Sequence, residues 1–283
     1  MVKGSPVGSN SSGFFIFADL LDRDKFRSYI SYPMNDFKII QIENKAEEPV
    51  RTVILPDNSI VLAFQSGAPV YELISGKPTV LPRVHICGQL TQKKEYLREP
   101  GSKSTLIKFQ PWQVGLLING LHEFTDQNIE LNSLANSKLE ERLLNDEILA
   151  DNIGSLLSDI VNNYKNIDKS ILNALLIIKK TKGQIKVEEL AYQVCNSKRN
   201  FERKFREAIG LTPKKYITNA RFRHSVSLLL SDEDLTGISY DCGYYDQSHF
   251  IHDFKSITGV APESYPSLIR PIENWALAKK VYS

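Results

Sequence analysis

A group of basic side chains between residues 198 and 209 has the chemistry to contact a polyanion. Phe201, Phe205 and Ile209 recur at i, i+4 and i+8, which predicts a helix with one buried side. The exposed side of that helix would hold five cations: Lys198, Arg199, Arg203, Lys204 and Arg206. Such side chains neutralise phosphates, and an arginine can donate two hydrogen bonds to one guanine. The segment therefore indicates a surface suited to phosphates and base edges.

The residues directly before this helix predict a partner helix that would position it. Four apolar residues follow the i, i+3, i+4, i+7 spacing of a buried stripe: Val187, Leu190, Ala191 and Val194. Cys195 and Asn196 would form the turn, and asparagine is the side chain better suited to a left-handed backbone conformation. Ser197 can cap the basic helix, and Gly210 can end it.

A second pair of short helices is indicated about fifty residues further on. Residues 235–242 predict a helix that stops at Gly243, because glycine adopts the left-handed conformation without steric cost. Asp246 can cap the next helix, which would bury Phe250 and Phe254. Two short helices joined by a three- or four-residue turn form a helix-turn-helix unit, whose second helix enters the DNA major groove.

One longer helix is predicted between the two units. Thr212 is a suitable N-cap, Pro213 suits the first helical position, and the apolar pattern continues to Leu230. At ~1.5 Å per residue the helix would span roughly 27 Å. Major-groove faces on one side of B-DNA are ~34 Å apart, so one rigid helix could hold two recognition helices in consecutive grooves.

These residues resemble the DNA-binding domain of the AraC/XylS family of bacterial transcription regulators, from Ser170 to Tyr265. So many matches in one order over two repeats are specific, whereas a lone helix-turn-helix pattern is weak. The resemblance is carried by Leu190-Ala191, Ser197, Arg203, Phe205, Gly210, Thr212-Pro213, Tyr216, Arg221, Gly243-Tyr244, Asp246, Ser248-His249-Phe250, Phe254-Lys255, Gly259, Pro262 and Tyr265.

The resemblance implies a role for each exposed position of the second helices. Base-facing or groove-facing positions would be Arg199, Glu202, Arg203, Gln247, Ser248, Ile251 and His252. Phosphate-facing positions would be Lys198, Asn200, Lys204, Arg206, His249 and Lys255. The chain departs from the family at His252, where members often have arginine, which predicts a weak or pH-dependent contact. His249 also fits a structural role at the start of its helix, beside Phe250.

Charge is distributed unevenly along the chain. The net charge is only +2 overall. Residues 169–265 contain 15 basic and 11 acidic residues, a net +4, whereas residues 1–168 contain 17 and 21, a net −4. The basic half carries the helix-turn-helix patterns, as phosphate contact requires, and the modest excess predicts salt-sensitive binding.

Cysteine and histidine usage argues against a metal or cofactor site. Cys87, Cys195 and Cys242 are scattered without CxxC spacing, and the last two are expected to be buried at the ends of their helices. His249 and His252 lie three residues apart, but no thiol or carboxylate set completes a site. Because no signal peptide or membrane-spanning run is evident, we expect a cytoplasmic protein with no membrane partner.

Residues 37–119 change to short apolar runs separated by turn residues, which predicts about seven strands in a β-barrel or sandwich. The runs are Phe37–Ile42, Thr52–Leu55, Ile60–Phe64, Val70–Ile74, Val84–Cys87, Lys94–Tyr96 and Thr105–Phe109, with a short helix from Pro111. The segment loosely resembles the degenerate cupin-like domain of one branch of the same family, through Leu55-Pro56-Asp57, Gly88-Gln89, Phe109-Gln110-Pro111 and Phe124-Thr125-Asp126. His85 and His122 are too few for a cupin metal centre, and His85 is expected to be a packed histidine.

The predicted fold class is α+β: an N-terminal cupin-like β-barrel, a helical linker and a C-terminal all-α domain with two helix-turn-helix motifs. The expected divisions are 1–12 (disordered), 13–132 (barrel), 133–168 (linker), 169–267 (DNA-binding) and 268–283 (tail). An apolar stripe between Leu139 and Tyr164 suits homodimerisation or packing within one chain, and the two interpretations weigh equally here.

The combined interpretation is a one-component transcription regulator, not an enzyme, that binds promoter DNA. The family resemblance implies a small-molecule effector in the barrel, while the simpler alternative is a barrel that serves only for association. RNA polymerase would be a further partner of an activator. Two alternatives remain open: an accessory DNA-binding protein whose barrel binds another protein, and an enzyme domain fused to a DNA-binding module.

Overall fold

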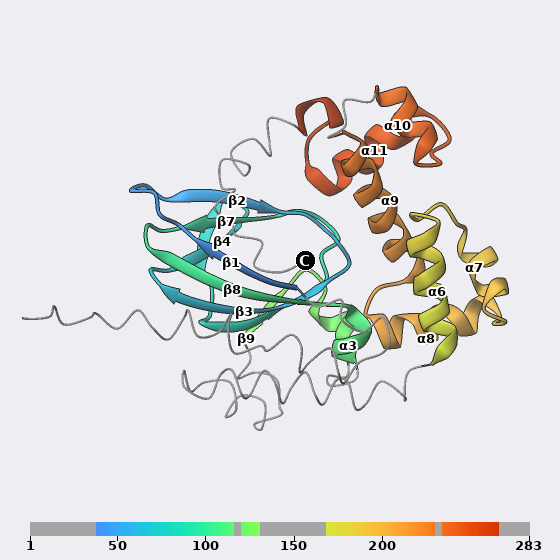
Figure 1. Cartoon of the computed structure of the whole chain (residues 1–283), viewed down its shortest axis with the longest axis horizontal. Coiled ribbons are helices and arrows are strands. Elements are labelled where there is room, and N and C mark those ends of the chain that lie inside the picture. The colour runs from blue at the N-terminus through green and yellow to red at the C-terminus, as the bar shows by residue number, and fades with distance from the viewer. Residues whose placement is uncertain (1–37, 116–119, 131–167, 230–233, 266–283) are drawn as a thin grey trace, which may run out of the picture.

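The computed structural model describes residues 38–115, 120–130, 168–229 and 234–265, which form a β-rich part and a helical part beside it (Figure 1). The expected N-terminal segment 1–12, the tail 268–283 and the apolar stripe between residues 139 and 164 lie outside the described residues.

The β-rich part consists of two antiparallel sheets rather than a closed barrel. The first sheet has the order β1-β8-β3-β6-β9 and the second has the order β2-β7-β4-β5. The first contains β1 (Lys38–Glu43), β3 (Ile60–Gly67), β6 (Val84–Cys87), β8 (Ser102–Phe109) and β9 (Asn128–Glu130). The second contains β2 (Val50–Ile54), β4 (Val70–Ile74), β5 (Lys77–Val80) and β7 (Lys94–Arg98). The expected sandwich geometry is thus found, and the expected barrel closure is not.

All seven strands expected from the sequence are present, with ends shifted by a few residues. Two described strands, β5 and β9, carried no usable sequence signal. Every residue of β5 is exposed, so no alternation of apolar and polar side chains marks it. Strand β9 has only three residues and pairs with β6 through Ile129 opposite Ile86. Both strands lie at a sheet edge, where burial imposes the weakest pattern.

Two short helical segments continue from the sheets towards the helical part. Helix α3 (Pro111–Gly115) begins directly after β8, where a short helix was expected, and the 3₁₀ helix η1 (Leu121–Phe124) precedes β9. Trp112 of α3 is 9% exposed and belongs to the core cluster of the helical part. Helix α3, which follows β8 directly, therefore contributes a large aromatic side chain to the core of the neighbouring helices.

Six α-helices and a final 3₁₀ turn make up the described helical part. They are α6 (Lys169–Lys180), α7 (Val187–Gln193), α8 (Lys198–Ile209), α9 (Pro213–Leu229), α10 (Leu235–Asp241), α11 (Gln247–Thr258) and η4 (Pro262–Ser264). The pairs α7–α8 and α10–α11 each join a helix of 7 residues to one of 12 residues. This repetition confirms the two helix-turn-helix units that the sequence predicts.

Helix α9 is shared between two hydrophobic clusters. Tyr216 and Ile217, near its start, pack in the cluster that contains α6, α7 and α8. Phe222, near its middle, packs in the cluster that contains α10 and α11. Figure 1 shows α9 between the two units, with α7 and α8 at one end and α10 and α11 at the other. One helix therefore forms part of both cores.

The helix ends follow the local signals of the sequence, with one correction. Ser197 and Asp246 cap α8 and α11 by accepting backbone N–H bonds, and Gly243 has a φ of 68°. In the first turn, however, the left-handed residue is Cys195, with a φ of 55°, and not Asn196. Asn196 instead uses its side chain, whose Nδ2 donates to the Val194 carbonyl at 3.1 Å. The prediction that Cys195 is buried is also wrong, because it is exposed.

A buried amide cluster joins the sheets to α9. Asn58, in the turn between β2 and β3, donates from Nδ2 to the Tyr216 carbonyl at 2.9 Å. Asn219 donates from Nδ2 to Asn58 Oδ1 and to the Leu90 carbonyl, both at 2.9 Å. A second contact lies near α11, where the Lys93 backbone N–H donates to the Ile257 carbonyl at 2.8 Å. The β-rich part thus contacts both α9 and the second helix-turn-helix unit.

Candidate nucleic-acid interface

Helix α8 exposes most of the cations that the sequence assigns to this surface. Phe201, Phe205 and Ile209 are fully buried, which turns the opposite side of the helix to solvent. The exposed cations are Lys198, Arg199, Arg203 and Arg206. Glu202, expected to face a base, is half-buried on the same helix. The first unit therefore presents a positively charged, largely open second helix.

Lys198 is held at the start of α8 by Glu188 of α7. Its Nζ lies 2.6 Å from Glu188 Oε1, and this hydrogen bond raises the pKa of the lysine. Both side chains are more than half exposed, so the pair contributes little to stability. A phosphate oxygen can take the place of the Glu188 carboxylate, which keeps Lys198 suitable for the phosphate role.

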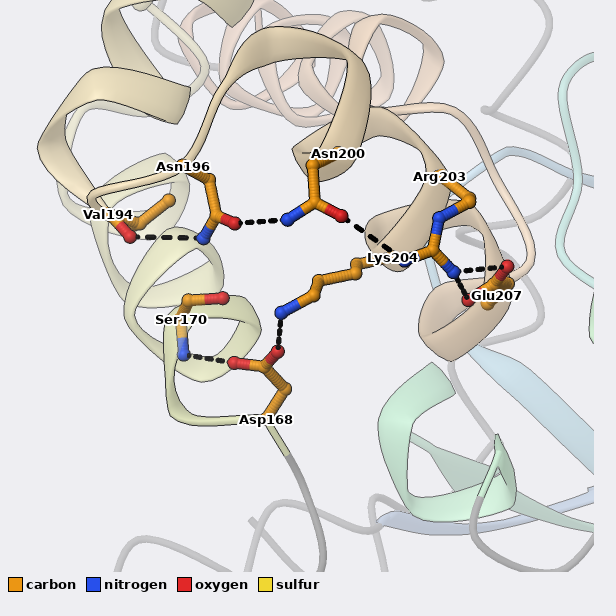
Figure 2. Close-up of polar contacts among 8 residues, drawn as sticks. All are labelled: Asp168, Ser170, Val194, Asn196, Asn200, Arg203, Lys204 and Glu207. Atoms are coloured by element: carbon orange, nitrogen blue, oxygen red, sulfur yellow. Dashed lines mark hydrogen bonds and ion pairs between the residues drawn. The ribbon is translucent and has the colours of Figure 1, made fainter.

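The Lys204 side chain points towards the start of α6 instead of the open face of α8. Its Nζ lies 2.8 Å from Asp168 Oδ2 (Figure 2). Asp168 also caps α6, since its Oδ1 accepts the Ser170 backbone N–H at 2.8 Å. The hydrogen bonds from Lys204 and Ser170 lower the pKa of Asp168 to about 2. Lys204 therefore ties α8 to α6, and its sequence-based phosphate role stays a prediction.

Arg203, on the open side of α8, makes three side-chain hydrogen bonds. Its Nη1 donates to both carboxylate oxygens of Glu207, at 2.9 and 2.8 Å, and its Nη2 donates to Asn200 Oδ1 at 3.1 Å. Figure 2 shows these side chains in a row along the helix, continued by Asn196 in the preceding turn. Glu207 and Asn196 were missed by the sequence analysis, although their i, i+4 spacing from Arg203 and Asn200 is a usable signal.

The second unit presents a different chemistry. Ser248, His252 and Lys255 of α11 are exposed, and 82% of the His252 side chain is accessible. Gln247 is half-buried, and its Oε1 accepts from the Thr236 hydroxyl at 3.4 Å. Lys255 is the lone lysine or arginine within α11, against five in α8. The first unit therefore carries most of the positive charge.

Two residues that the sequence places on the DNA-facing side of α11 are partly packed against other side chains of the second unit. Ile251 is half-buried against the cluster of α10 and α11. His249 lies edge-on to the Tyr244 ring, with centroids 5.4 Å apart, and its Nε2 is 3.8 Å from Asp253 Oδ2. These contacts fit the structural interpretation of His249. About half of the His249 side chain, which carries Nε2, is nevertheless exposed.

Arg221 of α9 connects the two units and was not assigned a role from the sequence. Its Nε and Nη2 donate to the Gly183 carbonyl at 3.3 and 3.2 Å, just before α7. Its guanidinium also lies 5.2 Å from the ring centroid of Tyr244, in the turn of the second unit. Gln184 adds a hydrogen bond from Nε2 to the Asp241 carbonyl at 2.5 Å. These contacts link the segment before the first unit to α9 and to the second unit.

Gly183 must be a glycine because the backbone of α9 approaches it closely. A Cβ atom there would lie 2.6 Å from the Arg221 nitrogen and from the Ile217 carbonyl oxygen. Its φ of 79° also falls in the left-handed region that favours glycine. The close approach is what brings the Gly183 carbonyl within reach of the Arg221 side chain.

Other ionisable residues form no alternative centre within the described part of the chain. No group of three or more His, Cys, Asp or Glu residues is placed there to hold a metal ion. His85 is packed, as expected, with Nδ1 2.9 Å from the Pro82 carbonyl oxygen. Burial raises the pKa of the Cys87 thiol to about 12. No helix in the described ranges is long and apolar enough to cross a membrane.

Residues 190–267 match a family model described as a helix-turn-helix domain. An uncharacterised HTH-type transcriptional regulator of Haemophilus influenzae is 30% identical over 100 residues, which covers 35% of this chain and 34% of the relative. The HTH-type transcriptional activator RhaS of Klebsiella pneumoniae is 39% identical over 69 residues, covering 24% and 25%. The chain thus matches a quarter to a third of the length of these curated relatives.

Among solved structures, ToxT from Vibrio cholerae aligns with 83% of this chain and 98% of its own, at 15% identity and a TM-score of 0.44. The family-model match, residues 190–267, falls on the helical part that contains the two helix pairs and the shared helix described above. Residues 190–267 are therefore similar to the helix-turn-helix domain found in HTH-type transcriptional regulators.

Proposed function

We propose that the protein is a sequence-specific DNA-binding transcription regulator that reads two consecutive major grooves. The proposal rests on one observation: two helix-turn-helix units with helices of the same lengths are joined by one helix, α9. Each unit presents an exposed second helix of the kind that enters a major groove. With 17 residues, α9 spans about 25 Å, which suits units that address neighbouring groove faces ~34 Å apart.

The two units would contribute unequally to binding. In the first unit we propose base contacts from Arg199, Glu202 and Arg203, with Lys198 and Arg206 on phosphate. In the second unit we propose groove contacts from Gln247, Ser248, Ile251 and His252, with Lys255 and His249 near the backbone. Since most of the cations lie on α8, the first unit would supply most of the salt-dependent affinity.

The direct test is selection of bound duplexes from a random DNA pool with the full chain at physiological salt. We expect a motif with two short conserved blocks about one helical turn apart. Failure of the full chain to enrich any sequence would contradict the proposal as stated.

Substitutions of two arginines on α8 distinguish a base contact from a phosphate contact. Arg203→Ala should cost ~1–3 kcal/mol on the selected duplex and relax the preference at one base position. Arg206→Ala should weaken binding to all duplexes by a similar factor and reduce the slope against log salt by about one. Equal effects of both substitutions on selected and random duplexes would contradict these base-facing and phosphate-facing roles.

Control of this activity by a small-molecule effector belongs to the same proposal. A hollow of about 540 Å³ lies where the β-rich and helical parts meet. Asp57 and Trp112 line it from one side, and Leu172, Leu175 and Tyr216 from the other. A ligand there would contact both parts at once and could change the orientation of the first unit. This position differs from the interior of the β-rich part, where the sequence suggested an effector.

The remaining partners follow from the regulatory role. RNA polymerase would be contacted if the protein activates transcription, and the protein would act in the cytoplasm, where bacterial promoter DNA lies. Homodimerisation through the stripe between residues 139 and 164 would double the number of DNA-binding units, and the mass of the protein in solution tests it. The proposal requires no catalytic step.

A further inference from the structure

We propose that Asn196 and Asn200 are positioning residues that orient Arg203, so that the base preference of the first unit is set by a chain of three side chains. This inference rests on the proposed function, because it concerns how Arg203 meets a base. It also gives Asn200 a role different from the phosphate contact that the sequence suggested.

The side chains form one continuous series of hydrogen bonds along the open face of the first unit (Figure 2). Asn196 Nδ2 donates to the Val194 carbonyl at 3.1 Å. Asn200 Nδ2 donates to Asn196 Oδ1 at 2.8 Å. Arg203 Nη2 then donates to Asn200 Oδ1 at 3.1 Å. The series therefore runs from the backbone of the turn to the guanidinium.

The direction of these bonds is dictated by the arginine. A guanidinium has only donors, so Asn200 must turn its oxygen towards Arg203 and its NH₂ group away. That NH₂ group requires an acceptor, which is the oxygen of Asn196. The NH₂ group of Asn196 then finds the carbonyl of Val194, at the C-terminal end of α7, where helix carbonyls lack helical partners. Each amide thus has one orientation that satisfies its neighbours.

Glu207 holds the guanidinium from the opposite side. Its two oxygens accept from Arg203 Nη1, so the guanidinium is fixed between Glu207 and Asn200. Three bonds engage a group that has five N–H donors, which leaves donors for a base edge. Holding a flexible side chain in one orientation before binding lowers the entropic cost of forming a two-bond contact.

The second unit lacks this arrangement. Counting from the caps Ser197 and Asp246, the positions of Asn200, Arg203 and Glu207 are taken by His249, His252 and Ser256. The His252 side chain is 82% exposed, and its Nδ1 lies 3.7 Å from Asp253 Oδ1. An arginine held in one orientation for contact with a base therefore occurs at this position in the first unit and not in the second. The half of the DNA site bound by the first unit should accordingly show the stronger base preference.

The test uses the full chain with Asn196→Ala, Arg203→Ala, the double variant, and Gln193→Ala as the matched control. Gln193 is an exposed amide of the same unit that donates to Glu189 at 3.1 Å, outside the series. Dissociation constants are measured on the selected duplex, on duplexes changed at the base whose preference Arg203→Ala relaxes, and on a random duplex.

Arg203→Ala should lose roughly 5- to 150-fold of discrimination at that base. Asn196→Ala should lose on the order of two- to tenfold at the same base, with an unchanged affinity for the random duplex and an unchanged salt slope. In the Arg203→Ala background the Asn196 substitution should have no further effect. Gln193→Ala should behave as the parent protein.

The inference is overturned if Asn196→Ala weakens binding to all duplexes by the same factor with or without Arg203, because that marks a purely structural role in the turn. It is also overturned if discrimination survives Asn196→Ala intact. Failure of the proposed function looks different, since the unsubstituted chain would then prefer no duplex at all.

Discussion

His85 combines deep burial with a titratable side chain. It lies on β6 with 1% of its surface exposed, and its ring contacts the Pro82 carbonyl oxygen. Burial disfavours the charged imidazolium and lowers the pKa of His85 to about 4. The folded protein therefore keeps this ring neutral across a pH range in which an exposed histidine takes up a proton.

This difference predicts a specific acid sensitivity. Between about pH 6.5 and pH 4 the unfolded chain binds a proton at His85 that the folded protein does not, so stability falls as pH decreases through that range. The full loss is on the order of 3–4 kcal/mol. In urea unfolding at pH 7 and pH 4.5, His85→Gln should show a smaller difference between the two pH values. An identical pH dependence in both proteins would contradict the prediction.

Exposure of the arginines on α8 could be predicted from the sequence, but the partner of Lys204 could not. The i, i+4 pattern of Phe201 and Phe205 was sufficient to place Arg199, Arg203 and Arg206 on the open side of α8. Lys204 lies at the edge of that side, and its partner Asp168 is 36 residues earlier in the chain. No local rule connects two residues so far apart, because their distance depends on how α6 packs against α8.

At the scale of elements, α9 positions the two recognition helices relative to each other. It shares Tyr216 and Ile217 with one core and Phe222 with the other. Apolar packing alone tolerates small rotations, whereas the directional bonds from Arg221 to the Gly183 carbonyl do not. We therefore assign the fine orientation of the units to Arg221.

Arg221→Met keeps an unbranched side chain of similar length but removes the hydrogen bonds and the charge over Tyr244. We expect the variant to bind the selected duplex more weakly, and to distinguish less well between duplexes whose two blocks are moved apart or together by one base pair. Electrophoretic mobility shifts on such a series measure this. Arg223→Met, two residues along the same helix, is the control that should keep the spacing preference. Unchanged spacing preference in Arg221→Met would rule out the assigned role.

At the scale of the whole molecule, the sheets and the helices share buried contacts. Trp112 of α3 lies in the first helical cluster, and Leu55 packs against the second. The amide cluster of Asn58 and Asn219 is buried at the same junction. The two parts are therefore expected to unfold as one cooperative unit and not as independent domains.

Asn219→Ala tests this coupling. The substitution leaves Asn58 Oδ1 and the Leu90 carbonyl without their donor, and each buried polar group left unpaired costs ~1–3 kcal/mol. We expect a lower Tm and faster hydrogen exchange at the Leu90 and Tyr216 ends of the junction. Ser227→Ala, at an exposed position of α9, should leave both unchanged. An unaltered Tm in Asn219→Ala would show that the junction does not stabilise the fold.

The helix-turn-helix pairs, the caps Ser197 and Asp246, and most strands could be read from the amino-acid sequence, because each depends on residues within a few positions of one another. The open sheets, the contacts of Arg221 with both units and the contact between Asn58 and Asn219 became known only from the packing of the folded chain. The reason is physical: periodicity and capping are local properties of the backbone, whereas these contacts join residues up to 161 positions apart. Such contacts exist only once the packing of whole elements has brought them within hydrogen-bonding distance.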